Sequence, residues 1–357
     1  MKWVTGAIVA SVLVTLTACG SSTSSSPSPA QPNVMRAGQF FLRRYVDGDG
    51  RVVRRDQGGD TVSEGQAYGM LIAAGLGDWK RFDTIWAWTR SHLRRPDGLL
   101  SFRWAGGRVV GSQPATDADL DAARALLVAG CARGRSDLRQ AGVALGRAVL
   151  GHETARRGSQ LIVAAGPWAI GQPVTVNPSY LAPATLHALA VASGDRAFAQ
   201  AADDGRALVA KLSTPLPPDW ATVDANGNAT PSGPPGQNVA AQYGFDAART
   251  LVRMAEDPAP AGRKIAADAW PVFRDQRPDT IVLERHLDGS PAGGTHTPLA
   301  LVAAAGAARA AGDRQEVSRL LDAAAVQDAR APTYYGSAWV ALGRLLLTTR
   351  RLAGDCS

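Results

Sequence analysis

Acidic residues stand at the start of three apolar helical stretches of the sequence. Glu64 lies in VSEGQAYGM, Asp117 in ATDADLD and Asp246 in QYGFDAAR. Free N–H groups at a helix start stabilise a carboxylate, and capping alone would account for Asp117. It accounts less well for Glu64, because Thr61 or Ser63 can already cap that helix. Carboxyl groups gathered from three helices could act as a general acid and base, provided that their surroundings separate their pKa values.

The residues around these acids leave room for a ligand and offer surfaces on which it can bind. Gly65 keeps the helix face beside the first acid small. Most aromatic side chains belong to cores or core edges, but Phe102, Trp104 and Trp168 lie in loops between helices, where a ring can stack on the flat face of a sugar. Asp121, one turn after the second acid, is expected to be solvated or to cap its helix.

Helical periodicity predicts the elements that carry these residues. The pattern predicts helices at 34–44, 63–77, 81–94, 117–132, 136–154, 183–193, 196–212, 240–255, 262–276, 295–310, 313–326 and 334–349. They form pairs in which an Ala- and Gly-rich helix precedes an amphipathic one, and the last helix would pair with the first. This pattern is typical of an all-α fold, an α/α barrel with buried inner helices and amphipathic outer ones. An irregular solenoid of helical hairpins is the alternative.

Four longer loops, rich in Gly, Pro and Trp, join one pair of helices to the next. Loops gathered at one end of a barrel would build its site. Strand-like patterns occur only at 107–110 and 280–284, and both are short.

Five segments, in order, resemble successive motifs of the family 8 glycoside hydrolases. They are VSEGQAYGM, FDTIWAWT (82–89), ATDADLD with the following AARALLVA, VNPSYLAPA (176–184) and GFDAAR (244–249). The resemblance covers about residues 40–350, and its specific motifs are SEGQ-YGM and ATDAD-D. It implies an (α/α)6 barrel and endo-acting hydrolysis of β-1,4-linked glucan, chitosan or xylan, with inversion at the anomeric carbon.

The resemblance also implies a role for each matching residue. Glu64 resembles the proton donor, Asp246 resembles the base that activates water, and Asp117 resembles the acid that holds the sugar beside the cleaved bond. Tyr180 and Arg249 resemble the polar residues around the water and the base. An inverting pair must leave space for water, so its two carboxyl groups are expected about 6.5–9.5 Å apart.

One aromatic position departs from the family pattern. Phe102 stands where the family often has a Trp that stacks on the substrate, and Trp104 is a candidate to substitute for it. Trp168 is a third candidate for substrate binding, from the loop between the second and third helix pairs.

The N-terminus resembles a bacterial lipoprotein signal. Residues 7–18 form an apolar run too short to span a membrane, and it ends in LTAC with Cys19. We expect a signal peptide at 1–18, lipidation of Cys19, a flexible Ser- and Pro-rich segment at 19–33 and one catalytic domain at 34–357. The protein would then be held on the outer face of the cytoplasmic membrane. An ordinary secretion signal with an incidental Cys is the alternative.

The two remaining cysteines, Cys131 and Cys356, could pair in an oxidising compartment, or Cys131 could stay free and buried. No CxxC motif and no His or Cys cluster has the spacing of metal ligands, so we expect neither a metal nor another cofactor.

The net charge and the residues of the loops limit the kinds of partner and substrate that we expect. The formal charge of +7 is spread along the chain without a basic block, which argues against nucleic acid. We expect a β-glucan substrate and a monomer. The alternatives are a chitosanase on the same fold, a non-catalytic surface protein that binds polysaccharide, and a helical scaffold for other proteins. Loops with several Arg and few acids favour a neutral glucan over cationic chitosan.

Overall fold

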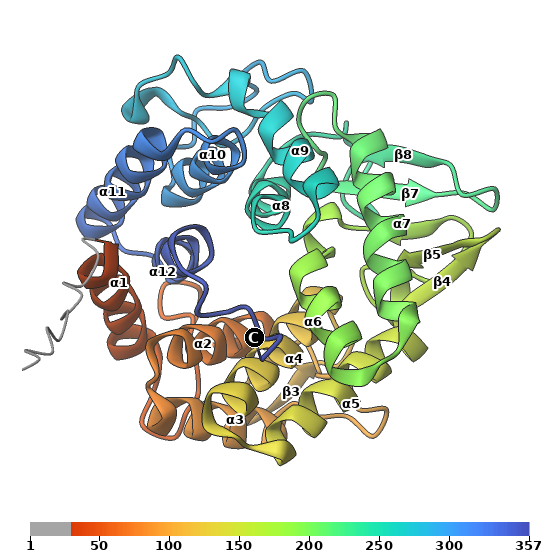
Figure 1. The fold of residues 1–357 in the computed structure, drawn as a ribbon, viewed down its shortest axis with the longest axis vertical. Helices are drawn as coiled ribbons and strands as arrows, with labels where there is room; N and C mark the ends of the chain where they lie inside the picture. The colour runs from red at the N-terminus through yellow and green to blue at the C-terminus, as the bar shows by residue number, and fades with distance from the viewer. Residues whose placement is uncertain (1–29, 357) are drawn as a thin grey trace, which may run out of the picture.

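Two concentric rings of helices build the protein in the computed structural model, which describes residues 30–356 (Figure 1). The inner ring consists of α2 (Ser63–Leu76), α4 (Thr116–Arg133), α6 (Pro183–Ser193), α8 (Phe245–Ala255), α10 (Pro298–Ala310) and α12 (Tyr334–Thr348). The outer ring consists of α1 (Ala30–Tyr45), α3 (Trp79–His92), α5 (Ser136–His152), α7 (Arg196–Leu212), α9 (Pro260–Asp268) and α11 (Arg314–Arg330). This is an (α/α)6 barrel, as predicted, and α1 packs against α12 where the ring closes.

The residues of each helix explain whether it lies in the inner or the outer ring. The inner helices α2, α4, α8, α10 and α12 are buried on nearly all sides, and small residues let them approach closely. A Cβ on Gly75 of α2, for example, would lie 2.7 Å from the side chain of Leu345 on α12. The outer helices bury one face, and three of them begin with an aspartate cap, at Asp78, Asp195 and Asp313. The inner helix α6 differs from the prediction, since His187 on it is exposed.

Short strands lie in four of the connections between helices. They form antiparallel sheets: β1 (Thr61–Val62), β2 (Arg103–Ala105) and β3 (Arg108–Gly111); β4 (Thr154–Arg157) and β5 (Gln160–Val163); and β6 (Val174–Val176), β7 (Trp220–Val223) and β8 (Ala229–Ser232). Short 3₁₀ helices also occur at Pro167–Ala169, Pro178–Tyr180, Trp270–Val272 and Pro278–Thr280. The strand predicted at 107–110 corresponds to β3, displaced by one residue.

Four sequence predictions about these elements were wrong. Residues 280–284 form no strand; their alternation reflects the burial of Ile281 and Leu283, and only the next residue, Arg285, makes isolated bridges. Two inner helices begin later than predicted, α8 at Phe245 and α10 at Pro298, because extended segments precede both. The outer helix expected at 262–276 is α9, which ends at Asp268 before a 3₁₀ turn.

The segment after α12 returns across the barrel, and Figure 1 marks its end over the inner ring. A disulfide joins Cys356 to Cys131 on α4, so the two cysteines pair. Among residues 30–356, no helix is both long and apolar enough to cross a membrane. The predicted signal peptide, most of the Ser- and Pro-rich segment and the Cys19 lipidation site lie outside the described residues.

Candidate active site

One arginine connects the three acids that the sequence singled out. Glu64 lies in the first turn of α2, Asp117 in that of α4 and Asp246 in that of α8. Nη1 of Arg249 donates to Oε2 of Glu64 at 3.2 Å and to Oδ2 of Asp117 at 2.7 Å. Its Nη2 donates to Oδ1 of Asp246. The predicted acids therefore meet at one end of the barrel, around a single buried guanidinium.

The starts of α2 and α4 are free of side-chain caps, which corrects the expectation for the first helix. The residue before α2 is Val62, and the residue before α4 is Ala115, neither of which can cap. The hydroxyl of Thr61 donates to the carbonyl of Val52 instead. The positive end of each helix dipole thus lies beside the acids and favours negative charge there.

Glu64 has the electrostatic surroundings of a group that carries a proton near neutral pH. Burial, helped by the carboxylates of Asp117 and Asp246 and opposed by Arg249, raises its pKa to about 7. Its side chain nevertheless remains 20% exposed. A carboxyl group that keeps its proton at pH 7 and is open to solvent can serve as a general acid.

The other two carboxyl groups differ in their access to solvent. Asp117 is only 2% exposed, and burial raises its pKa despite the bond from Arg249. Its Oδ1 also accepts from the N–H of Ala118 at 2.9 Å. Asp246 is 27% exposed, so water can reach the acid that would activate it. Asp117 can grip a bound group from the interior, whereas Asp246 faces the solvent side.

Tyrosines complete the surroundings of the guanidinium. The ring of Tyr180 lies 5.4 Å from Cζ of Arg249, within range of a cation–π contact. Nη1 of Arg249 also donates to the hydroxyl of Tyr68, whose ring packs edge-on against Trp339. Tyr180 was a predicted site residue, but the role of Tyr68 was not predicted, although the residue lies inside the first motif.

The three loop aromatic residues predicted to bind substrate differ in how far they are exposed to solvent. Phe102 is 39% exposed and its carbonyl accepts from the N–H of Ser63 at the start of α2, which places it beside the acids. Trp168 is 42% exposed, and its ring lies 6.4 Å from that of Trp220. Trp104 instead packs edge-on against aromatic rings of the outer helix α3. Phe102 and Trp168 are therefore open to a ligand, and Trp104 mainly braces the loop.

Three ion pairs, each between residues with the same sequence separation, connect α4 to α8 and the residue that follows it. Asp117 pairs with Arg249 and Asp121 pairs with Arg253. Farther along, Arg124 pairs with Glu256, and each pair joins residues 132 positions apart. The constant offset shows that the two helices run in the same direction across the interior. The expectation that Asp121 is solvated or caps its helix was wrong, because Asp121 is buried against Arg253.

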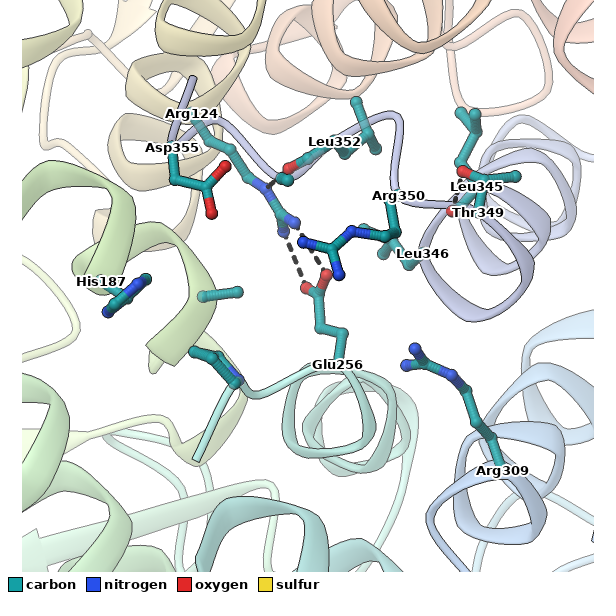
Figure 2. A pocket seen from close by; sticks show the side chains of 13 residues that line it. Arg124, His187, Glu256, Arg309, Leu345, Leu346, Thr349, Arg350, Leu352 and Asp355 are labelled. Atoms are coloured by element: carbon teal, nitrogen blue, oxygen red, sulfur yellow. Dashed lines mark hydrogen bonds and ion pairs between the residues drawn. The ribbon is translucent and has the colours of Figure 1, made fainter. Parts of the chain in front are cut away.

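A cavity at the opposite end of the barrel is separate from the acids. It has a volume of about 200 Å³ and lies at the end of α8 away from Asp246. Figure 2 shows Arg124 joined to Glu256 by two hydrogen bonds, with Arg309 and Arg350 beside them. The segment after α12 contributes part of the wall. No group of three or more potential metal ligands occurs in residues 30–356.

An α/α barrel with an acid of raised pKa and a solvent-facing carboxylate at one end has the parts needed for acid–base hydrolysis. The family model described as glycosyl hydrolases family 8 matches residues 6–349. The chain belongs to that family.

Curated relatives and solved structures are similar to this chain. A probable endoglucanase of Novacetimonas hansenii is 36% identical over 57% of this chain and 62% of its own length. Endoglucanase A of Acetivibrio thermocellus is 32% identical over 56% of this chain and 42% of its own length. The chain thus aligns with less than two thirds of either relative. The endo-β-1,4-glucanase of Acetobacter xylinum has a TM-score of 0.75 at 26% identity, covering 88% of this chain and 97% of that one.

Proposed function

We propose that the protein hydrolyses internal β-1,4-glucosidic bonds of cellulose or a related β-glucan, with inversion of the anomeric carbon. The observation that carries this proposal is the meeting of Glu64, Asp117 and Asp246 at Arg249. Family membership and the endoglucanase names of the similar proteins support the substrate class.

The proposed reaction uses two carboxyl groups in complementary states. Glu64, whose pKa is about 7, donates its proton to the glycosidic oxygen as the bond from that oxygen to C1 breaks. Ionised Asp246 takes a proton from water, and the water oxygen bonds to C1 from the opposite face. Asp246 then returns its proton to solvent, and Glu64 takes one back. The product has an α-anomeric hydroxyl where the substrate had a β-bond.

Binding would use the buried acid and the open aromatic rings. Asp117, held rigidly by Arg249, can accept hydrogen bonds from hydroxyls of the reactive sugar. Trp168, Trp220 and Tyr180 form a row of rings, with 6.4 Å and 6.1 Å between neighbouring centroids. Such rings can stack on successive sugars, and Phe102 would add a contact near α2.

The test is hydrolysis of several β-glycans by the purified full chain. Reducing-sugar release from carboxymethylcellulose, lichenan, chitosan and xylan, measured side by side, should favour a β-glucan. Preferred cleavage of chitosan would support the chitosanase alternative instead, and binding without any cleavage would support the non-catalytic one. Proton NMR of a β-linked oligosaccharide should show the α-anomer first; initial formation of the β-anomer would refute inversion.

We also propose that the protein is an exported monomer held on the outer face of the cytoplasmic membrane by lipid on Cys19. The short apolar run that ends at Cys19 supports this, and so does the Cys131–Cys356 disulfide, because such bonds persist in oxidising compartments. Two acyl chains give stable retention where one does not. Cys19→Ala should leave the membrane fraction or remain unprocessed, and unchanged fractionation would contradict the anchor. Light scattering after size exclusion tests the monomer.

A further inference from the structure

The helix that carries Asp246 is capped by a residue from a distant segment. The residue before α8 is Gly244, which has no side chain to cap it. Oδ1 of Asp219, just before β7, accepts from the N–H of Gly244 at 3.0 Å and from that of Ala247 at 2.7 Å. These are groups that a helix start leaves unpaired, so Asp219 acts as the cap of α8.

Asp219 contacts the segment at the start of α8 closely, through both its side chain and its backbone. A Cβ on Gly244 would lie 2.5 Å from Oδ2 of Asp219, so glycine there lets the carboxylate approach. The N–H of Asp219 donates to the carbonyl of Gln242, which joins the two segments a second time. Asp246 lies between the two capped residues, Gly244 and Ala247. Its backbone is therefore fixed by Asp219 and its side chain by Arg249.

We propose that Asp219 is a positioning residue for the reaction, which fixes the backbone under Asp246 and places a second negative charge beside it. The inference rests on the proposed function, since it takes Asp246 as the base that activates water. It adds a residue to the site that neither the motifs nor the spacing of the sequence indicated.

The charges around Asp219 support an electrostatic role as well. Burial, helped by the charge of Asp246 and opposed by three backbone N–H groups at the start of α8, raises its pKa to about 6. The ionisable groups that interact with Asp219 are Asp246 on α8 and Tyr243 before it. Asp246 pairs in turn with Arg249, which also holds Glu64 and Asp117. Above pH 6, the ionised Asp219 adds a second negative charge beside the proposed base.

The neighbour of Asp219 in sequence gives a way to separate positioning from binding. Trp220 belongs to the row of rings proposed to bind sugars, and it lies 6.1 Å from Tyr180. If removal of the Asp219 side chain only loosened β7, it would disturb Trp220 and raise KM. If removal instead displaced Asp246, it would lower kcat and leave KM nearly unchanged.

Two variants of Asp219 in the full chain test the proposal. Asp219→Ala removes both cap bonds and should lower kcat about 100-fold, with KM within about 3-fold, because small displacements of a catalytic group have such effects. Asp219→Asn keeps an oxygen that accepts both N–H groups, so it should retain the fold and much of kcat. It should lose the rise in rate through pH 6 that the ionisation of Asp219 provides. The matched control is Asp224→Asn, at an exposed aspartate after β7 that also accepts from two backbone N–H groups.

A readout independent of hydrolysis separates this inference from the proposed function. Carbon-13 NMR of carboxyl-labelled aspartates should show a step near pH 6 in the Asp246 signal, identified by its loss in Asp246→Asn. That step should vanish in Asp219→Asn and persist in Asp224→Asn. If no glycan is cleaved, but the step near pH 6 vanishes in Asp219→Asn and persists in Asp224→Asn, the proposed function is refuted. The interaction between Asp219 and Asp246 is then still supported. A cleaving enzyme in which Asp219→Ala lowers kcat less than about 3-fold, or in which Asp219→Asn leaves the step intact, would overturn the inference.

Discussion

Arg249 and Asp117 form an ion pair inside the barrel, with 2.7 Å between Nη1 and Oδ2 and only 2% of either side chain exposed. The same guanidinium holds Glu64 and Asp246, so the pair sits between the proposed acid and the proposed base. Breaking one partner of a buried pair leaves an uncompensated charge and costs about 3–5 kcal/mol. Substitutions at either residue should therefore be felt both in stability and in turnover.

The first prediction concerns the charge of Asp117. Asp117→Asn should retain the fold but lower kcat about 100-fold or more, because the loss of a grip on the distorted sugar removes several kcal/mol from the transition state. Thermal unfolding and steady-state kinetics on a β-glucan measure the two effects. If Asp117 only stabilises the start of α4, Asn would serve nearly as well, and an unchanged kcat would favour that role.

The second prediction concerns the shape of the Arg249 side chain. Arg249→Lys keeps the positive charge but cannot bond three carboxylates and Tyr68 in the fixed geometry of a guanidinium. We expect kcat to fall at least about 100-fold. Arg249→Gln should in addition lower the free energy of unfolding by about 3–5 kcal/mol, measured by denaturant titration.

Arg319 provides a matched control for this substitution. It pairs with Glu316 on the outer helix α11, where its side chain is 39% exposed. Exposed pairs contribute about 0–1 kcal/mol, so Arg319→Lys should leave stability and kcat nearly unchanged. Equal losses in the Arg249 and Arg319 variants would refute a special role for the buried guanidinium.

The third prediction concerns pH. Glu64 must be protonated to act as an acid, and burial raises its pKa to about 7. The profile of kcat/KM should therefore decline as pH rises through about 7. Glu64→Gln should abolish hydrolysis of natural glucans and recover in part on an aryl glycoside whose leaving group needs no proton. An alkaline limb that persists in Glu64→Gln on the aryl glycoside would assign it to another group.

The same shift predicts a pH-dependent cost in stability. The pKa of Glu64 in the folded state lies above its ordinary value of 4.5, so folding disfavours the ionised form. The stability present below pH 4.5 is lost as pH rises toward about 7, by on the order of 2–3 kcal/mol. Glu64→Gln should thus unfold at a higher temperature than the unchanged protein at pH 8, with a smaller difference at pH 5.

Local patterns in the sequence predicted the barrel and the three acids because both depend on short-range information. Helical periodicity identified the alternating inner and outer helices, and Glu64, Asp117 and Asp246 each lie in the first turn of an inner helix. Parallel inner helices then bring their first turns to one end. The prediction of caps at Thr61 or Ser63 failed because Thr61 belongs to β1, where its hydroxyl bonds to another segment.

The residues that sequence reasoning missed act through long-range contacts. Asp219 meets α8 only because β7 passes beside the start of that helix. Asp121 is buried because Arg253 faces it across the interior, one turn from Arg249. A signal for this second pair was present, since Asp117 and Asp121 share the four-residue spacing of Arg249 and Arg253. To predict the Asp121–Arg253 pair from this spacing, one would have needed to know that α4 and α8 run parallel.

The fourth prediction concerns the segment after α12. The Cys131–Cys356 bond closes a span of 225 residues, and the carbonyl of Leu352 accepts from Nε of Arg124 beside the cavity in Figure 2. Removing a cross-link of this length should lower the free energy of unfolding by about 2–5 kcal/mol. Cys356→Ser should therefore unfold at lower temperature, with kcat nearly unchanged because the acids lie at the other end of the barrel. A large loss of kcat below the unfolding transition would show that this segment affects the site.

The last prediction concerns the activation of water. Asp246→Asn keeps the size of the side chain and can still accept from Arg249, but an amide cannot take a proton from water. Activity should be lost on natural glucans and also on the aryl glycoside that partly rescues Glu64→Gln, because both substrates need the attacking water. Azide needs no base, and Asp246 is 27% exposed, so added azide can enter from the same side. With an activated β-linked substrate, Asp246→Asn should then form the α-glycosyl azide, detected by NMR and mass spectrometry. Formation of the β-azide would place a covalent intermediate on the enzyme and overturn the role of Asp246 as a base acting through water.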